Sequence, residues 1–267
     1  MIFKYEKELE IARKIAIDAG EILESYFRKN LQVSLKNDRT EVTKADIESN
    51  QFIISELKRK FPRDSIVSEE LEDVDNRSER IWYIDPLDGT SHFIDGTPEF
   101  AIHIGLAENR KAVLGVVYNP ITKELYSGSK EGGAYKDFKG QKVRLNISQP
   151  LNRKLIAAVS PVEKDQQKVK EMLEKLNIEK GLKFGSTGLK IMKVAEGTVD
   201  IHVPVSLRYN SWDICAPQAI LEFANGYARY ISGKEVLYTV DFRGVKENVV
   251  FARSEKLFVY IQQKLEH

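Results

Sequence analysis

The sequence predicts an α/β (α+β) protein in which layers of helices and strands alternate. Three patterns support this prediction: helical periodicity near the N-terminus, a run of strands in the middle, and alternating strands and helices in the second half. Alternation at this density argues against an all-helical or an all-β fold. The 267 residues are enough to bury a substantial core, as one large domain or two closely packed halves.

Two helices are predicted in the N-terminal segment. Apolar residues recur at steps of three and four over residues 9–27, which gives a long helix one apolar face. A second helix is predicted from near Ala45 to a point before Pro62. Three of its apolar residues are expected to face inward: Ile47, Ile54 and Leu57.

Short strands are predicted on either side of the second helix. Residues 33–35 alternate apolar and polar side chains, and the polar residues 36–40 that follow are typical of a mobile surface loop. Residues 66–67 indicate another brief strand, which runs into the acidic pair Glu69-Glu70.

The centre of the chain holds the clearest strand patterns. The apolar run Ile81–Ile84 indicates a buried strand, which Pro86 and Gly89 are expected to end. An antiparallel meander is predicted to follow, with strands at Ala101–Ala107, Ala112–Tyr118 and Glu124–Tyr126 and later turns at Gly132-Gly133 and Gly140.

The second half alternates strands and helices. Strands are predicted at Leu155–Val159, Lys183–Phe184, Val199–Val203 and Val249–Ala252. Helices are predicted at Val169–Leu176, Leu189–Ala195 and Ile214–Phe223, with one more at the C-terminal end.

The overall composition excludes several classes of function. The formal net charge is +1, from 41 basic and 40 acidic side chains, so no global field favours a nucleic acid polymer or a membrane. The single cysteine, Cys215, excludes an internal disulfide framework and fits a reducing cytosol. Neither a signal peptide nor a membrane-spanning apolar run is visible. We therefore expect a cytoplasmic protein.

The segment Asp85-Pro86-Leu87-Asp88-Gly89-Thr90 is the most informative in the chain. Asp85 follows a buried strand, where an unpaired carboxylate is costly, so a bound positive charge is expected there. Hard divalent cations take oxygen ligands, which Asp85, Asp88 and the Leu87 carbonyl can supply. Gly89 and Thr90 offer backbone N–H groups at a helix start, where anions bind. A cation site beside an anion site indicates phosphate chemistry.

Simpler interpretations exist for each acidic position. Glu69-Glu70 can be a solvated turn, and Asp213 can be a helix N-cap. Asp85 and Asp88 can be ordinary turn formers. Trp212 is expected to be a packing residue that fixes the turn at Asp213, and Cys215 a small core residue. The three histidines near these segments share no metal-ligand spacing, so we expect them to be structural: His92, His103 and His202.

The joint order of these motifs resembles the inositol monophosphatase superfamily of Mg²⁺-dependent, lithium-sensitive phosphomonoesterases. The resemblance covers nearly the whole chain. It rests on Thr43-Lys44-Ala45-Asp46, Ser68-Glu69-Glu70, Trp82–Thr90, Gly185-Ser186-Thr187, Val194–Gly197 and Trp212–Ala216.

The resemblance implies two to three Mg²⁺ ions in each site. One ion is expected on Glu69, Asp85 and the Leu87 carbonyl, and a second on Asp85, Asp88 and Asp213. Glu69 and water would hold a third, weaker ion. A carboxylate that bridges two ions is reasonable, because it has two oxygens and the ions must lie close together.

The resemblance also implies direct attack on phosphorus by a metal-activated water. Three residues are expected to orient this water and accept its proton: Glu70, Thr90 and Asp46. The substrate is expected to contact Gly89, Thr90, Ser186, Thr187 and Lys36. Lys36 can equally be a surface lysine.

The family fold is a layered αβαβα sandwich of the inositol monophosphatase / fructose-1,6-bisphosphatase type. We expect residues 1–150 to hold two helices, an antiparallel sheet and most metal ligands. Residues 151–267 are expected to form an α/β half that carries Asp213, with both halves packed as one unit. The family also implies a homodimer.

Several small phosphorylated metabolites can be the substrate. Our leading hypothesis is a polyol or sugar phosphate, with inositol monophosphate as reference. The alternatives are 3′-dephosphorylation of adenosine 3′,5′-bisphosphate, hydrolysis of fructose 1,6-bisphosphate in the same site, or a non-catalytic binding protein. Residues 202–211 differ from both the inositol monophosphatase branch and the adenosine 3′,5′-bisphosphate phosphatase branch of the superfamily. Three residues can receive a second phosphate or a base: Lys190, Arg208 and Tyr209.

Overall fold

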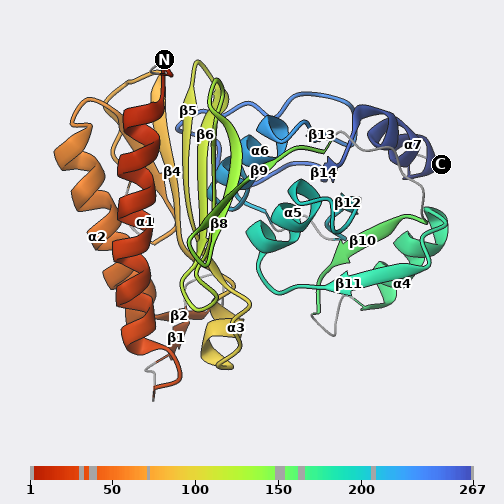
Figure 1. Cartoon of the computed structure of the whole chain (residues 1–267), viewed down its shortest axis with the longest axis horizontal. Coiled ribbons are helices and arrows are strands. Elements are labelled where there is room, and N and C mark those ends of the chain that lie inside the picture. The colour runs from red at the N-terminus through yellow and green to blue at the C-terminus, as the bar shows by residue number, and fades with distance from the viewer. Residues whose placement is uncertain are drawn as a thin grey trace.

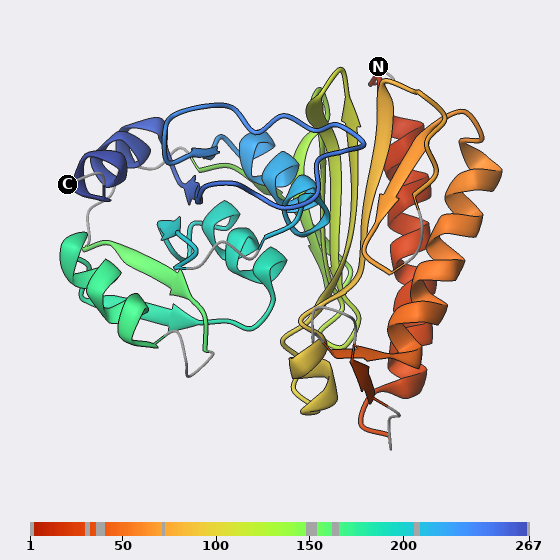
Figure 2. The same ribbon diagram turned by 180° about the vertical axis from the view of Figure 1, so that it is seen from behind.

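The computed structural model describes residues 3–29, 33–35, 41–70, 73–147, 154–161, 166–205 and 209–265. Five layers follow one another (Figures 1 and 2): helices, a large sheet, helices, a small sheet and helices. The outer helices on the large sheet are α1 (Glu6–Tyr26) and α2 (Lys44–Lys60). The central pair is α5 (Thr187–Ala195) and α6 (Ser211–Phe223), and the far pair is α4 (Gln166–Lys175) and α7 (Glu255–Leu265). The predicted αβαβα sandwich is confirmed.

The large sheet has seven strands in the order β3-β4-β5-β6-β7-β8-β9. Strands β3 and β4 pair in parallel, and each further pair from β4–β5 to β8–β9 is antiparallel. The strands are β3 (Ser65–Ser68), β4 (Arg80–Asp88), β5 (Ala101–Glu108), β6 (Lys111–Asn119), β7 (Glu124–Ser129), β8 (Gly133–Phe138) and β9 (Gln141–Leu145). The predicted meander is therefore correct, although it continues for two more strands.

The small sheet has five strands in the order β11-β10-β12-β14-β13. Its β10 strand pairs in parallel with both neighbours, whereas β14 is antiparallel to β12 and β13. The strands are β10 (Ile156–Val159), β11 (Lys180–Lys183), β12 (Ile201–His202), β13 (Tyr227–Tyr230) and β14 (Val249–Ala252). A separate hairpin of β1 (Val33–Leu35) and β2 (Glu41–Thr43) lies with α3 (Thr90–Ile94) at one end of the large sheet (Figures 1 and 2).

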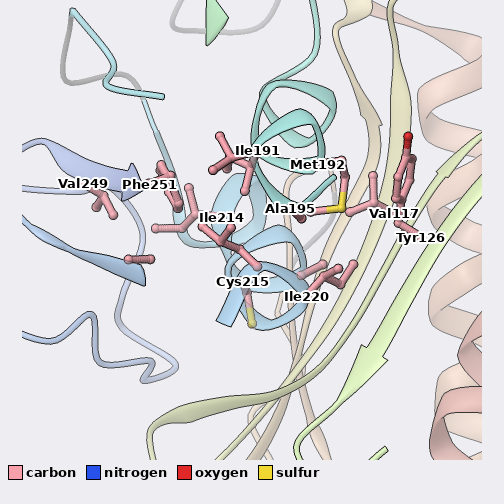
Figure 3. Close-up of a cluster of buried hydrophobic side chains, with 14 of the residues drawn as sticks. Val117, Tyr126, Ile191, Met192, Ala195, Ile214, Cys215, Ile220, Val249 and Phe251 are labelled. Atoms are coloured by element: carbon pink, nitrogen blue, oxygen red, sulfur yellow. The ribbon is translucent and has the colours of Figure 1, made fainter. Parts of the chain in front are cut away.

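Helices α5 and α6 are apolar on both sides because they lie between the two sheets. Met192 of α5 faces Val117 and Tyr126 of the large sheet, whereas Ile191 and Ile214 lie toward the small-sheet residues Val249 and Phe251 (Figure 3). This shared layer joins the two halves expected from the sequence, residues 1–150 and residues 151–267. The division of the chain into these two halves is a proposal. None of the helices within the described ranges has the length and apolar character that crossing a bilayer requires.

A row of glycines lets α6 approach the large sheet closely. Gly105 pairs with Gly115 and Gly115 with Gly128 across β5, β6 and β7. A Cβ at Gly115 would lie 2.1 Å from the backbone oxygen of Ala216, and one at Gly105 would lie 2.8 Å from the Ala216 nitrogen. Glycine in a strand often marks such a close backbone approach. Cys215 is buried in the same contact, as predicted.

Two sequence predictions are wrong in detail. Ile47 was expected to face inward, but its side chain is 38% exposed, because the buried face of α2 is formed by Ile53, Ile54 and Leu57 instead. Strand β4 does not end at Pro86: it continues to Asp88, with a register shift against β5 between Asp85 and Asp88. Such an irregularity accommodates a proline, which cannot donate to the ladder.

Candidate active site

Parallel pairing of β3 and β4 brings two acidic segments together. Ser68 is the partner of Ile84 in the ladder, and the Glu69 N–H donates to the Ile84 carbonyl at 3.3 Å. Because parallel strands end at the same edge, Glu69 lies beside Asp85. The sequence predicted both residues as ligands, and the sheet makes their segments neighbours.

Helix α6 carries Asp213 to the same place from the second half of the chain. Asp213 lies in the first turn, and its Oδ2 accepts the Asn210 N–H at 2.7 Å. Asn210 is the N-cap of α6, so the interpretation of Asp213 as the N-cap is wrong; Asp213 is the third helical residue and completes a capping box with Asn210. Burial raises the pKa of Asp213 well above its ordinary value, and the charges of Glu69 and Asp88 raise it further. Asp213 thus lies within electrostatic range of carboxylates from the other half.

Asp85 lies at the centre of this acidic group and is 1% exposed. Burial raises its pKa well above the ordinary value, although the Leu87 N–H donates to its Oδ1 at 3.0 Å. Three neighbouring carboxylates raise this pKa further: Glu69, Asp88 and Asp213. Across the described ranges, no group of three or more His, Cys, Asp or Glu is already arranged to hold a metal ion. The carboxylates are neighbours, not a preformed cage.

Asp88 is held by the first turn of α5. Its Oδ2 accepts the Ser186 hydroxyl at 2.5 Å and the Gly188 N–H at 2.8 Å. The His103 Nε2 lies 3.3 Å from the same oxygen, close enough for an ion pair, although the alignment does not make a hydrogen bond. Burial raises the pKa of Asp88, but His103, Ser186 and Lys190 outweigh burial and lower it. The pKa of Asp88 is thus shifted in the opposite direction to those of Asp85 and Asp213.

Thr90 connects two other predicted site residues. Its hydroxyl lies 3.2 Å from Asp46 Oδ1 and 3.2 Å from the Leu87 carbonyl, and one proton serves these two acceptors. Asp46 is 1% exposed and also caps α2, because its Oδ2 accepts the Thr43 N–H at 2.8 Å. Burial raises the pKa of Asp46, and the charge of Glu69 adds to the effect, although hydrogen bonds from Thr43 and Thr90 oppose it. A buried acid beside a hydroxyl can hold or move a proton.

Known proteins resemble this chain over most of its length. The model of the inositol monophosphatase family matches residues 4–265. The chain belongs to the inositol monophosphatase family. A 3′(2′),5′-bisphosphate nucleotidase of Haemophilus influenzae is 34% identical over 79% of this chain and 80% of the relative. Inositol monophosphatase 3 of Solanum lycopersicum is 30% identical over 86% of this chain and 88% of the relative.

Solved structures show the same family relationship. An inositol monophosphatase from Thermotoga maritima has a TM-score of 0.79 at 27% identity, with 97% of this chain and 98% of that one covered. One from Zymomonas mobilis has a TM-score of 0.78 at 27% identity, with both chains covered completely. Because the relatives are phosphatases, this family member is a phosphoric monoester hydrolase, and the non-catalytic alternative is not supported.

Other predicted site residues have different surroundings. Ser186 was expected to contact substrate, yet it is fully buried and also accepts the Leu189 N–H at 3.1 Å as the N-cap of α5. Thr187 is 7% exposed and interacts with Tyr209. Gly89 precedes α3 with a φ of 99°, which glycine adopts readily. Lys36 and Arg208 lie outside the described residues.

Two further buried residues surround Asp88. His103 was interpreted as structural; it is fully buried and lies against Asp88 and Gly188, where a Cβ would be 2.0 Å from its Nε2. Lys190 was predicted to be able to receive a second phosphate or a base; it is 4% exposed, and its amino group donates to the Gly185 carbonyl at 2.9 Å. Its helical spacing next to apolar Leu189 and Ile191 did not reveal this burial.

Thr90→Ala is expected to slow turnover about 100-fold, because the variant lacks the hydroxyl that connects Asp46 with the Leu87 carbonyl. The Mg²⁺ concentration for half-maximal activity should change little. Steady-state kinetics across a Mg²⁺ titration measures both quantities. Thr90→Ser keeps the hydroxyl and is the matched control, which should retain most activity. A large loss of Mg²⁺ affinity in Thr90→Ala would mean that this role is wrong.

Proposed function

We propose that this chain is a Mg²⁺-dependent phosphatase for a small polyol or sugar phosphate, with inositol monophosphate as reference substrate. The observation that supports this proposal most strongly is the buried Asp85, whose pKa is raised by burial and by three carboxylates from both halves of the chain. So much negative charge at a buried position is expected where a cation binds.

The donor set fits Mg²⁺. Five residues would hold two to three ions through oxygen atoms: Glu69, Asp85, Leu87 (carbonyl), Asp88 and Asp213. Magnesium prefers oxygen ligands and keeps several waters, so few protein ligands are needed for each ion. When bound, Mg²⁺ would offset the negative charge of the phosphate and lower the pKa of water.

The chain's own residues would orient the reactants and handle the proton. Thr90 and Asp46 would hold the attacking water by their hydrogen-bonded pair, and Glu70 would help to accept its proton. The N–H groups of Gly89 and Thr90 would bind phosphate oxygens. Water adds to phosphorus, the ester P–O bond breaks, and the alcohol leaves with a proton as inorganic phosphate is released.

A substrate panel tests this proposal. Phosphate release should be measured at fixed Mg²⁺ with inositol monophosphate, adenosine 3′,5′-bisphosphate and fructose 1,6-bisphosphate. We expect measurable hydrolysis of inositol monophosphate, its loss on chelation with EDTA, and inhibition by Li⁺. A kcat/KM several hundredfold higher for adenosine 3′,5′-bisphosphate, a difference of about 3–4 kcal/mol, would mean that the nucleotide and not inositol monophosphate is the preferred substrate.

The buried Lys190 favours a bisphosphate as the second candidate substrate. The pKa of Lys190 is lowered, because burial outweighs the charges of Asp88, Glu99 and Asp213, which raise it; these charges place its amino group within electrostatic range of the site. An ammonium group at this depth would suit a second phosphate, whose own charge favours the protonated form. Curated relatives include a 3′(2′),5′-bisphosphate nucleotidase and a fructose-1,6-bisphosphatase/inositol-1-monophosphatase of Thermotoga maritima, 30% identical over 85% of this chain.

Lys190→Met should separate the two candidates. The kcat/KM for either bisphosphate, divided by that for inositol monophosphate, should fall about tenfold, since one charge–charge interaction is lost. The exposed Lys183→Met is the matched control and should leave the ratio unchanged. An unchanged ratio in Lys190→Met would show that the ammonium group does not receive a second phosphate.

We propose a homodimer in the cytoplasm from the family resemblance. Light scattering on the purified protein tests the assembly state directly, and a monomeric mass would contradict it. Fractionation of the source cells tests the location.

A further inference from the structure

Residues 243–245 form a seam beside the start of α6. The Arg243 carbonyl accepts the Ser211 N–H at 2.6 Å, and Gly244 forms a β-bridge with Asn210. The Val245 N–H donates to the Tyr209 carbonyl at 2.9 Å. This backbone pairing fixes Arg243 next to the helix turn that carries Asp213.

The Arg243 side chain reaches the other acidic segment. Its Nη1 lies 3.4 Å from the Ser68 carbonyl, and its Nη2 forms a close ion pair with Asp73. Asp73 in turn accepts the Ser68 N–H at 3.3 Å. Both backbone polar groups of Ser68, directly before Glu69, therefore take part in one cluster with Arg243 and Asp73.

The same guanidinium group covers the ring of Trp212. Its central carbon lies 5.4 Å from the ring centroid, and Trp212 is 8% exposed. The indole Nε1 is buried and has no hydrogen-bond partner among the described residues, so contacts on the ring face hold this side chain. Trp212 directly precedes Asp213. Arg243 thus contacts the residue before Glu69 and the residue before Asp213 at once.

We propose that Arg243 is a positioning residue that sets the spacing between the Glu69-Glu70 segment and Asp213, and thereby the Mg²⁺ affinity of the site. This inference rests on the proposed function. Arginine suits the role because its planar fork donates in two directions while its face stacks on an aromatic ring. Lysine offers a point charge without that plane. Groups that orient metal ligands commonly change metal affinity when they are removed.

Titration calorimetry with MgCl₂ on the full chain tests this role without relying on activity. Arg243→Gln should weaken Mg²⁺ binding about tenfold, and turnover at saturating Mg²⁺ should stay within about twofold. Arg243→Lys should have a Mg²⁺ affinity between those of the wild type and Arg243→Gln. Asp73→Asn should weaken binding about two- to fivefold, as expected from a partly exposed ion pair. The double variant Arg243→Gln/Asp73→Asn should bind Mg²⁺ no more weakly than Arg243→Gln alone, because both substitutions break the same cluster.

Arg229→Gln is the matched control. Arg229 pairs with Glu222 at 2.9 Å and lies 4.8 Å from the Tyr227 ring centroid, so it makes the same two kinds of contact on β13. The Arg229→Gln variant should lose about as much thermal stability as Arg243→Gln and should keep the wild-type Mg²⁺ affinity. Wild-type Mg²⁺ affinity in both Arg243→Gln and Arg243→Lys would overturn the positioning role while leaving the proposed function intact. A wild-type protein that binds no Mg²⁺ would overturn both.

Discussion

Asp88→Asn is expected to lower kcat about 1,000-fold, which corresponds to about 4 kcal/mol of lost stabilisation in the transition state. The substitution removes one negative charge from the proposed metal site at nearly constant volume. Asp88 is also the carboxylate that His103, Ser186 and Lys190 keep ionised by lowering its pKa. The amide of asparagine stays neutral, so it cannot replace this charge.

The folded state should survive this change. The carboxamide oxygen of the new side chain can still accept the Gly188 N–H, and no core volume is removed. Steady-state kinetics measures the loss of turnover, and a thermal melt measures the stability of the fold. Asp18→Asn, the same substitution at an ion-paired aspartate of α1 far from the site, is the control. Near-normal turnover in Asp88→Asn would refute the metal assignment.

Gly115→Ala is expected to destabilise the protein by about 3 kcal/mol and to lower Tm by about 6–12 °C. The new Cβ would lie 2.1 Å from the Ala216 oxygen and 2.9 Å from the Ala216 carbonyl carbon. Both atoms belong to the backbone of α6, so a side-chain rotation cannot relieve the clash. The helix has to move away from the sheet.

That movement should also affect the site, because α6 carries Asp213. We expect weaker Mg²⁺ binding in Gly115→Ala at temperatures where the variant is still folded. For the thermal melt, Gly244→Ala is the matched control, since its Cβ would meet only Asn210 Oδ1 at 3.7 Å, an ordinary contact. A Tm of Gly115→Ala within 1–2 °C of wild type would correspond to a destabilisation of only about 0.5 kcal/mol. That result would show that the close approach of α6 to the sheet does not constrain the helix.

The elements with strong periodicity could be predicted well from the sequence. The first helix was expected over residues 9–27 and forms α1 at Glu6–Tyr26, because its apolar face has no alternative but to pack on the sheet. Strands β8 and β9 were missed for the opposite reason. Most of β9 is exposed at the edge of the sheet, and its apolar positions are only Val143 and Leu145, which is too short a run to predict a strand.

The site was only partly predictable. Asp85 and Asp88 are three residues apart, so their common chemistry was visible in the local sequence. Ser186 and Gly188 contact Asp88 from 98 and 100 residues away, and no local pattern signals such a contact. His103 reaches Asp88 only because Gly188 leaves room for its ring.

The sequence by itself determined the chemistry of the oxygen donors, the family and the identity of most helices and strands, since these depend on residue type and short-range order. Tertiary structure decided which donors meet. Parallel pairing of β3 with β4 places Glu69 beside Asp85, and the glycines of β5 and β6 let α6 bring Asp213 toward them. The physical reason is that such contacts depend on strand register and on backbone clearance, and neither is encoded within a single segment.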